Sequence, residues 1–451
     1  DIFGNAASVD HGYGHAAQQA VEDSRALIAK HINAREPGDV IFTSGATESD
    51  NIALTGIVEA YGHKGNHIVT SAIEHKAILD TLEHLGKRGI SSTLLPVDSY
   101  GMVDPNDVAN AITDQTLLVS IMMANNENVD YMSLHKSSIV IDTHCDTLGR
   151  VFEGQRRLGE NSKIGQFDLP RAIAGGLTAE LMATFVNTKR QGSGSLQTFQ
   201  FIDVFHEEID AYADLAMQAT DTEDILLAKK SGKVALVLSM EGAEGLEGDL
   251  GVLRTTYRLG LRVLGLTWNL RNEAADGVGE LRTGGGLTNF GVDLVRECNN
   301  LGIIVDMAHL SPQCVEDVLD TSESPVVVTH ANCHALWQHP RNLTDHQLEN
   351  IARKGGVVGV TAVPPFLGDN PEHSELDVLL NHLDHMISIM GKDGVGLGMD
   401  FDGIGDIRVG NIEDVSKLPN ITKGLVERGY DSQVIHNILG GNFMRVFSSV
   451  W

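Results

Sequence analysis

The sequence predicts an α/β protein in which a TIM-type (β/α)8 barrel follows a smaller, partial α/β domain. Three observations support this prediction. The chain has 451 residues, which is more than one typical domain holds. From residue 139 onward, short apolar runs alternate with helical patterns, as in a barrel of parallel strands. Before residue 130 a separate strand–helix alternation breaks off early, so we expect domains at 1–130 and 139–451, with a junction at 131–138.

The first domain is expected to alternate helices and strands. Apolar residues at helical spacing predict a helix over 16–33, and the β-branched run at 39–43 predicts a strand. The small and polar residues 44–51 then open a second helix, an arrangement whose backbone N–H groups suit a phosphate. Three more strands are expected, at 67–71, near 92–97 and at 117–123.

The second domain contains eight apolar runs, and its size fits a barrel with insertions. The expected strands are 139–146, 179–186, 234–241, 263–268, 302–309, 325–330, 356–363 and 394–400. The expected helices are 205–230, 249–260, 288–301, 311–320, 345–354, 376–391, 414–428 and 432–440. The junction before them has no periodicity, so we expect His135 and Lys136 to be exposed.

Composition narrows the possible functions. The formal net charge is −28, from 33 basic and 61 acidic residues, which argues against nucleic acid and against an anionic membrane surface as partners. No run approaches the roughly 18 apolar residues of a membrane-spanning helix, and the first residues lack the pattern of a signal peptide. The four cysteines form no CxxC pair, so we expect no disulfide framework and a cytoplasmic location.

Ionisable residues fall at the carboxyl ends of the predicted barrel strands, where (β/α)8 enzymes place their active sites. The first strand delivers His144 and Asp146 on one side, because side chains two residues apart share a face. Any single one of these residues could be an ordinary polar strand end. Buried together they must be paired or bind metal, so they predict a site for two divalent ions. The other strand ends contribute Glu241, His309, His330 and Asp400.

Four stretches of the first domain form a set: FGNAAS (3–8), FTSGATESDN (42–51), HIVTSAIEHKAILDT (67–81) and LLVSIMMANNEN (117–128). Together they resemble the pyridoxal-phosphate cysteine desulfurases of the class V aminotransferase family. The resemblance implies that Ala46 and Thr47 hold the cofactor phosphate. It also implies that His75 stacks on the cofactor ring and that Asn125 or Asn126 contacts it.

This likeness ends at about residue 128, before the family's pyridinium-binding Asp, Schiff-base Lys and nucleophilic Cys. A Schiff base needs a lysine amine at the cofactor aldehyde, and no downstream lysine stands in that context. We therefore expect a partial, catalytically empty domain of the pyridoxal-phosphate transferase type. Pyridoxal phosphate is not an expected cofactor.

Six stretches of the second domain form another set: DTHCD (142–146), SMEGAE (239–244), DMAHLS (306–311), VTHAN (328–332), PRN (340–342) and GMDFDG (398–403). They resemble the membrane (renal) dipeptidase family of the binuclear-zinc amidohydrolases, and the likeness spans residues 139–451. The resemblance implies two zinc ions per chain, with other divalent metals as candidates. It assigns His144 and Asp146 to one zinc and His309 and His330 to the other. Glu241 is implied to bridge both.

The resemblance also implies the reaction, which is hydrolysis of a dipeptide by a hydroxide that bridges the metals. Two zinc ions lower the pKa of a bridging water far enough to give hydroxide near neutral pH. Asp400 matches the catalytic Asp, a candidate to pass the water's proton to the leaving amine. Arg341 matches the Arg that holds the substrate's free carboxylate, for which its planar fork is suited. The family further implies a homodimer.

One position departs from the family pattern. Where members carry a His after the fourth strand, placed to hydrogen-bond the substrate carbonyl, this chain has Trp268. An indole offers one N–H and cannot bind metal, so the zinc, Asn269, Arg271 or Trp268 itself could stabilise that carbonyl. Three alternatives stay open. They are a hydrolase for another small amide, such as an N-acyl amino acid or a β-lactam, a metal-binding protein without hydrolytic activity, and a pyridoxal-phosphate desulfurase.

Overall fold

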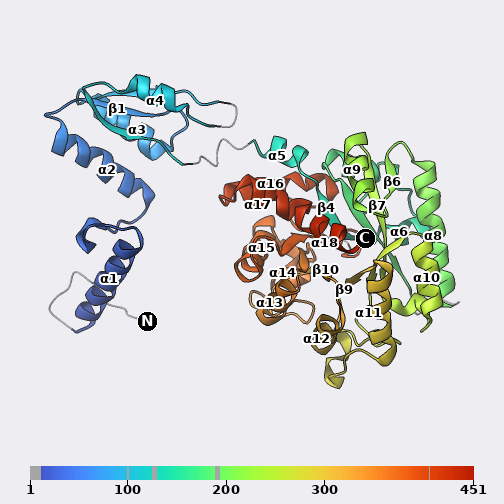
Figure 1. The fold of residues 1–451 in the computed structure, drawn as a ribbon. Helices are drawn as coiled ribbons and strands as arrows, with labels where there is room; N and C mark the ends of the chain where they lie inside the picture. Colours follow the sequence, from blue (N-terminus) through green and yellow to red (C-terminus); the bar gives the residue numbers. More distant parts are fainter. Residues whose placement is uncertain (1–11, 99–100, 124–129, 188–192, 406) are drawn as a thin grey trace. The chain divides into compact units, whose positions relative to one another are not determined.

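A computed structural model of the chain describes residues 12–98, 101–123, 130–187, 193–405 and 407–451 (Figure 1). The chain divides into two compact units, Asp1–Asn128 and Val129–Trp451. Within the described ranges, none of the helices combines the length and the apolar character that crossing a membrane requires.

The first unit is built on a three-stranded parallel sheet in the order β2-β1-β3. The central strand is buried throughout, and its Ile68 packs with Leu54 and Leu82 from helices on the sheet, so this unit has a small core of its own. The strands are β1 His67–Ser71, β2 Ser91–Leu95 and β3 Thr116–Ser120. The helices are α1 Gly12–His31, α2 Ala46–Tyr61, α3 Lys76–Gly86 and α4 Pro105–Ala111.

The strand predicted over residues 39–43 is not formed. A 3-10 turn, η1 Pro37–Asp39, takes up its start, and residues 40–43 belong to no sheet. Ile41 and Phe42 are 67% and 47% exposed, and the Val40 carbonyl accepts a hydrogen bond from the Arg25 side chain. Backbone groups need a partner strand to form a sheet, and the described sheet of this unit does not extend to them. The prediction was therefore wrong.

The second unit is a closed barrel of eight parallel strands, which confirms the predicted TIM-type fold. The order is β5-β4-β12-β11-β10-β9-β8-β7, and pairing of β5 with β7 closes the ring. A short extra strand, β6, lies beside the start of β7. The strands are β4 Ile141–Cys145, β5 Ala179–Phe185, β6 Ala216–Gln218, β7 Val234–Glu241, β8 Leu261–Gly265, β9 Ile304–Asp306, β10 Val327–Ala331, β11 Val357–Val360 and β12 Val395–Leu397.

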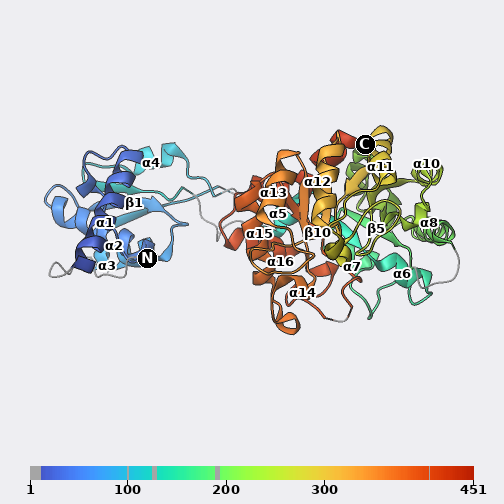
Figure 2. The same ribbon diagram turned by 90° about the horizontal axis from the view of Figure 1, so that it is seen from below.

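Helices form an outer layer around these strands (Figures 1 and 2). The segment predicted as one helix over 205–230 consists instead of the end of helix α8 (Gly194–Ala211), strand β6 and helix α9 (Thr222–Ser231). It breaks because residues 216–218 pair with β7 and because Asp221 caps a new helix at the Asp224 N–H. The helices are α6 Thr147–Phe152, α7 Leu169–Ala174, α8 Gly194–Ala211, α9 Thr222–Ser231, α10 Leu250–Arg258, α11 Asn289–Leu301, α12 Pro312–Thr321, α13 Asp345–Arg353, α14 Pro364–Leu367, α15 Leu376–Met390, α16 Pro419–Glu427, α17 Ser432–His436 and α18 Asn442–Val450.

The predicted junction contains a helix, α5 Tyr131–Ser137, which packs against α16. Lys136 is exposed, as predicted, but His135 is buried. The ring nitrogens of His135 lie 2.7 Å from Thr422 Oγ1 and 2.8 Å from the Gly175 carbonyl oxygen. The prediction for His135 was wrong because its partners come from distant parts of the chain, which the local pattern does not reveal.

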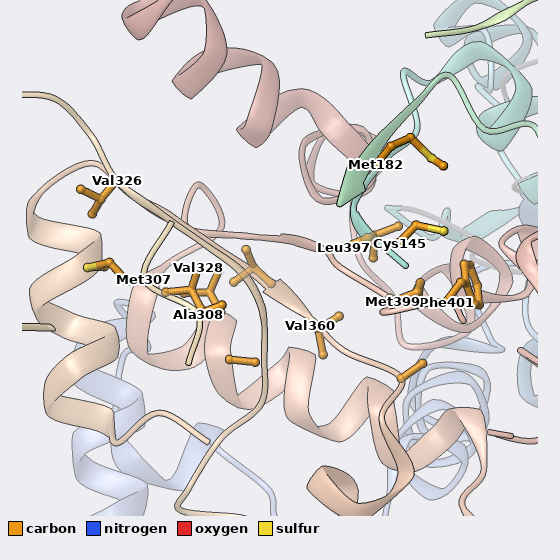
Figure 3. Close-up of a cluster of buried hydrophobic side chains, with 14 of the residues drawn as sticks. Cys145, Met182, Met307, Ala308, Val326, Val328, Val360, Leu397, Met399 and Phe401 are labelled. Carbon is orange, nitrogen blue, oxygen red and sulfur yellow. The ribbon is translucent and has the colours of Figure 1, made fainter. Parts of the chain in front are cut away.

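Helix α18 closes the end of the barrel at which the strands begin. Its Phe443, Val446 and Phe447 form one cluster with strand residues that include the first residues of β4, β9, β10 and β11. In Figure 1 this helix lies across the centre of the ring of strands. A second, larger cluster includes Cys145, which is buried and unpaired (Figure 3). Cys145 therefore contributes to the packing of the core.

Candidate metal centre

The ionisable residues predicted at the strand ends lie together at the end of the barrel opposite to α18. Most of them are buried, and only Asp146 and Asp400 are partly accessible. The barrel fold thus gathers groups that are distant in sequence around one mouth. They are His144 within β4, Asp146 directly after β4, Glu241 at the end of β7, His309 after β9, His330 within β10 and Asp400 after β12.

The Oε1 atom of Glu241 lies among three imidazoles. It is 2.9 Å from Nε2 of His309, 3.6 Å from Nε2 of His144 and 3.9 Å from Nε2 of His330. The Nε2 atoms of His309 and His330 are 3.0 Å apart. Ligand atoms of His144, Glu241 and His330 all lie within 4.8 Å of one another. This group is a candidate position for a cation.

A second group of ligand atoms shares His144. Its Nε2 lies 3.8 Å from Oδ2 of Asp146 and 4.0 Å from Oδ1 of Asp400, and the three ligand atoms are mutually within 4.8 Å. The two groups are therefore adjacent candidate positions for cations. The structure also places Asp400, which the sequence predicts as the proton carrier, among the possible ligands.

Hydrogen bonds orient two of the imidazoles toward the cluster. Nδ1 of His309 lies 2.8 Å from Oδ1 of Asn269, and Nδ1 of His330 lies 2.9 Å from Oγ1 of Thr329. The Thr329 hydroxyl in turn donates to Oδ2 of Asp306 at 2.8 Å. A proton on Nδ1 leaves Nε2 as the metal-binding atom. Burial lowers the pKa of both imidazoles well below the usual range, so both are neutral, as metal binding requires.

The electrostatics of the cluster favour a cation. Burial raises the pKa of Glu241 well above the usual carboxyl range, and the charge of Asp146 raises it further. Burial also raises the pKa of Asp400 to about 7. For His144, burial opposes the charged form, but the three neighbouring carboxylates outweigh burial and raise its pKa to about 10. Carboxylates crowded into a buried pocket are stabilised by a divalent ion.

The residues present fit zinc. Imidazole nitrogens with carboxylate oxygens are an established zinc donor set. Nε2 of His144 is buried and has no hydrogen-bond partner within the described part of the chain. A buried nitrogen without a partner costs free energy, and a metal ion would satisfy it.

Backbone contacts fix the loop that carries Asp400. The Asp400 N–H donates to the His144 carbonyl at 3.2 Å, and the Asp146 N–H donates to the Phe401 carbonyl at 2.9 Å. The Met399 N–H donates to Oδ1 of Asp142 at 2.7 Å, so this buried carboxylate holds the loop rather than facing the ligands. Asp400 has φ of +64°, and His309 has φ of +69°. Such strained backbone persists only where the surroundings hold it, often at functional sites.

A buried ion pair below this loop was not predicted from the sequence. The Arg156 guanidinium donates to Oδ2 of Asp402, and both side chains are almost fully buried. The Thr147 hydroxyl donates to the same oxygen, and the Gln166 N–H donates to Oδ1 at 2.7 Å. The sequence did contain a signal for Asp402. In Asp400–Phe401–Asp402 two ionisable residues are separated by one residue, which is the spacing of the two predicted ligands in the first strand. No comparable signal marks Arg156.

Arg341 is buried on the other side of the cluster. Its Nη2 lies 3.4 Å from the His330 carbonyl oxygen, and its Nε has no hydrogen-bond partner among the residues that the structure describes. Its guanidinium carbon lies 5.5 Å from the ring centre of Phe366. Burial lowers the pKa of Arg341 to about 10, so it stays charged at neutral pH.

This chain departs from the family pattern after the fourth barrel strand, and the structure places the three candidate residues there in different surroundings. Trp268 is 39% exposed and stands beside the centre, with its ring 5.9 Å from that of His309. Asn269 is engaged with His309, as described above. Arg271 donates two hydrogen bonds of 2.5 and 2.6 Å to Asp276, so its guanidinium is engaged in an ion pair at the surface.

The residues predicted as a vestigial cofactor site lie in the first unit. Ala46 and Thr47 are exposed at the start of α2, and the N–H and hydroxyl of the preceding Ser44 both donate to Glu48 at 2.7 Å. His75 is exposed and caps α3 by accepting a hydrogen bond from the Ala77 N–H. Asn125 and Asn126 fall outside the described residues. No metal-ligand cluster is found in the described part of this unit.

Fold and site together define the class of protein, a metal-dependent hydrolase on a (β/α)8 barrel. The chain belongs to the membrane dipeptidase family, peptidase family M19, whose family model matches residues 130–451. The model of class-V aminotransferases matches residues 1–129. Both resemblances seen in the sequence are thereby confirmed.

Known proteins of this kind match the second unit. Dipeptidase tcpJ of Claviceps purpurea (strain 20.1) is 32% identical over 296 residues, which are 63% of this chain and 69% of that protein. A metallopeptidase from Rhodobacter sphaeroides, solved with a phosphinate mimic of the dipeptide L-Ala-D-Ala, gives a TM-score of 0.66 at 28% identity over 70% of this chain and 100% of that chain. An amidohydrolase from Pseudomonas aeruginosa gives a TM-score of 0.63 at 28% identity, over 72% and 99%.

Proposed function

We propose that the second unit is a two-zinc dipeptidase for dipeptides with a free C-terminal carboxylate. The observation that carries this proposal is the convergence of three imidazoles on Oε1 of Glu241, with two further carboxylates alongside. The substrate class is supported by the dipeptidase from Claviceps purpurea and by the phosphinate dipeptide mimic bound to the metallopeptidase from Rhodobacter sphaeroides.

In this proposal the protein residues divide into ligands and proton carriers. His144 and Asp146 would hold one zinc, His309 and His330 the other, with Glu241 between them. Bound zinc lowers the pKa of water and polarises a peptide carbonyl. The Asp400 carboxylate is held at the edge of the ligand cluster by its loop. There it accepts the proton of the attacking water and gives it to the leaving amine.

Arg341 fixes the substrate. Its planar guanidinium matches a terminal carboxylate with two parallel hydrogen bonds, and its buried position excludes the water that would weaken them. A carboxylate held there restricts hydrolysis to the peptide bond next to the C-terminal residue.

Replacing Arg341 with lysine should raise KM for dipeptides by about 10- to 100-fold, because a charged hydrogen-bonding partner contributes about 1.5–3 kcal/mol and lysine lacks the planar fork. The measurement is steady-state kinetics on one dipeptide and on its C-terminal amide. The poor rate on the amide should not change. An equal loss on both substrates would show that Arg341 does not bind the carboxylate.

Metal analysis combined with a dipeptide screen tests the proposal as a whole. We expect about two zinc ions per chain, cleavage of several dipeptides, loss of activity on chelation and recovery with zinc. The variant Glu241→Gln keeps the side-chain shape but removes its charge, so it should bind less metal than the wild type. Protein that holds two zinc ions per chain and cleaves no dipeptide would rule the proposal out and favour a non-hydrolytic metal protein.

A homodimer and a cytoplasmic location belong to the same proposal. All four cysteines are described, buried and unpaired, which suits a reducing compartment. Sedimentation analysis of the full chain tests the oligomer.

A further inference from the structure

We infer that this chain selects dipeptides whose N-terminal residue has a large apolar or aromatic side chain. The inference rests on the proposed function and names the substrate within it. A cavity of about 300 Å³ adjoins the ligand cluster, since Asp146 and Glu241 form part of its wall. This volume lies at the lower end of the usual range for small-molecule sites, so it suits one bulky side chain.

Two pairs of aromatic side chains line the cavity beyond the ligands. Phe152 and Phe201 stack with ring centres 4.8 Å apart, and Phe185 meets Trp268 edge to face with ring centres 5.3 Å apart. The wall also carries polar side chains, which are Arg150, Glu153, Asn187, Gln197 and Asp402. Aromatic walls in these arrangements bind apolar and aromatic side chains well. Trp268, which stands where the family carries a histidine, thus becomes part of a side-chain pocket.

The position of Arg341 decides which substrate residue enters this cavity. Arg341 and His309 line a separate, smaller cavity of about 160 Å³, and neither of them lines the aromatic one. With the carboxylate at Arg341 and the peptide bond at the ligand cluster, the C-terminal residue occupies the side of Arg341. The N-terminal residue then extends to the opposite side, past Glu241 and Asp146 and into the aromatic cavity.

Gly149 keeps this cavity open. It lies in α6 on the cavity wall, and a Cβ built on it would meet no atom within 4 Å. A larger side chain at this position would therefore extend into empty space rather than into the protein. Because Gly149 has no positive φ and most residues favour helix over glycine, such a variant is expected to fold.

The experiment compares wild type, Gly149→Leu and Gly56→Leu on Gly-Ala, Phe-Ala and Ala-Phe. Gly56 lies exposed in α2, and a Cβ there also meets nothing within 4 Å, so it is a matched control. For wild type we expect kcat/KM for Phe-Ala to exceed that for Gly-Ala by about 10- to 200-fold, as an apolar pocket can provide. Gly149→Leu should remove this advantage through KM, so that the kcat/KM for Phe-Ala falls at least about tenfold more than those for Gly-Ala and Ala-Phe.

A binding measurement adds a readout that does not depend on turnover. Phosphinate dipeptide mimics with a benzyl or a hydrogen at the N-terminal side-chain position should differ in Kd for wild type and should be equal for Gly149→Leu. A loss on Ala-Phe instead of Phe-Ala would overturn the inference, and so would equal losses on all three dipeptides. Wild type that cleaves Gly-Ala as well as Phe-Ala would also overturn it, with the proposed function intact. If no dipeptide were cleaved, the proposed function itself would fail.

Discussion

Replacing Asp400 with asparagine is expected to lower kcat on dipeptides by about 10²- to 10⁴-fold, the usual contribution of a positioned general acid–base group. Asparagine keeps the shape of the side chain and a carbonyl oxygen, but it cannot accept the water's proton. The three hydrogen bonds that hold the loop, from the N–H groups of Met399, Asp400 and Asp146, do not involve the replaced carboxylate. KM should therefore change little.

The metal content decides how this result is interpreted. Asp400 also lies within ligand distance of His144 and Asp146, so a variant that loses zinc together with activity would be a ligand variant. We expect zinc analysis of Asp400→Asn to match wild type. Asp210→Asn, an exposed carboxylate on α8, is the matched control and should keep full activity. Retained activity in Asp400→Asn would exclude the proton-carrier role.

Replacing Arg156 with methionine is expected to lower the free energy of unfolding of the second unit by about 3–5 kcal/mol. Methionine preserves the apolar length of the side chain, so the loss arises mainly from Asp402, whose buried carboxylate then has no cation beside it. Urea unfolding followed by tryptophan fluorescence measures this effect. The chain has three tryptophans, Trp268, Trp337 and Trp451, and all lie in the second unit.

A second variant tests the cause of the destabilisation. Arg156→Met combined with Asp402→Asn removes both charges, and this double variant should regain much of the lost stability. A single variant that loses less than about 1 kcal/mol, the range of an exposed pair, would show that the ion pair is not buried in solution. A double variant less stable than either single one would show that packing, rather than charge, is the main contribution.

The barrel and its ligands were predictable for one physical reason. Parallel strands buried on both faces appear as continuous apolar runs, so the strands ending near His144, Glu241 and His330 were recognisable individually. The barrel rule then predicts that residues at their carboxyl ends meet. Neither step requires knowledge of distant contacts, and the structure gathers all six predicted groups.

Features that depend on distant partners were not predictable in this way. The segment at 39–43 has a strand-like composition but lacks a neighbouring strand. Residues 216–218 form a strand only because the start of β7 lies beside them. His135 is buried by Thr422 and Gly175, and Arg156 finds Asp402 across 246 positions of sequence. Local sequence patterns do not reveal contacts between residues that are distant in the sequence.

The helix that closes the base of the barrel imposes an order on the synthesis of the protein. Phe443, Val446 and Phe447 follow every barrel strand in sequence, yet they pack against the first residues of β4, β9, β10 and β11. Until α18 has been synthesised, the first residues of those strands do not have this helix packed against them. The first unit, with its own core, can fold as it emerges. The packing at the base of the barrel is therefore complete only once residues 443–447 have been made.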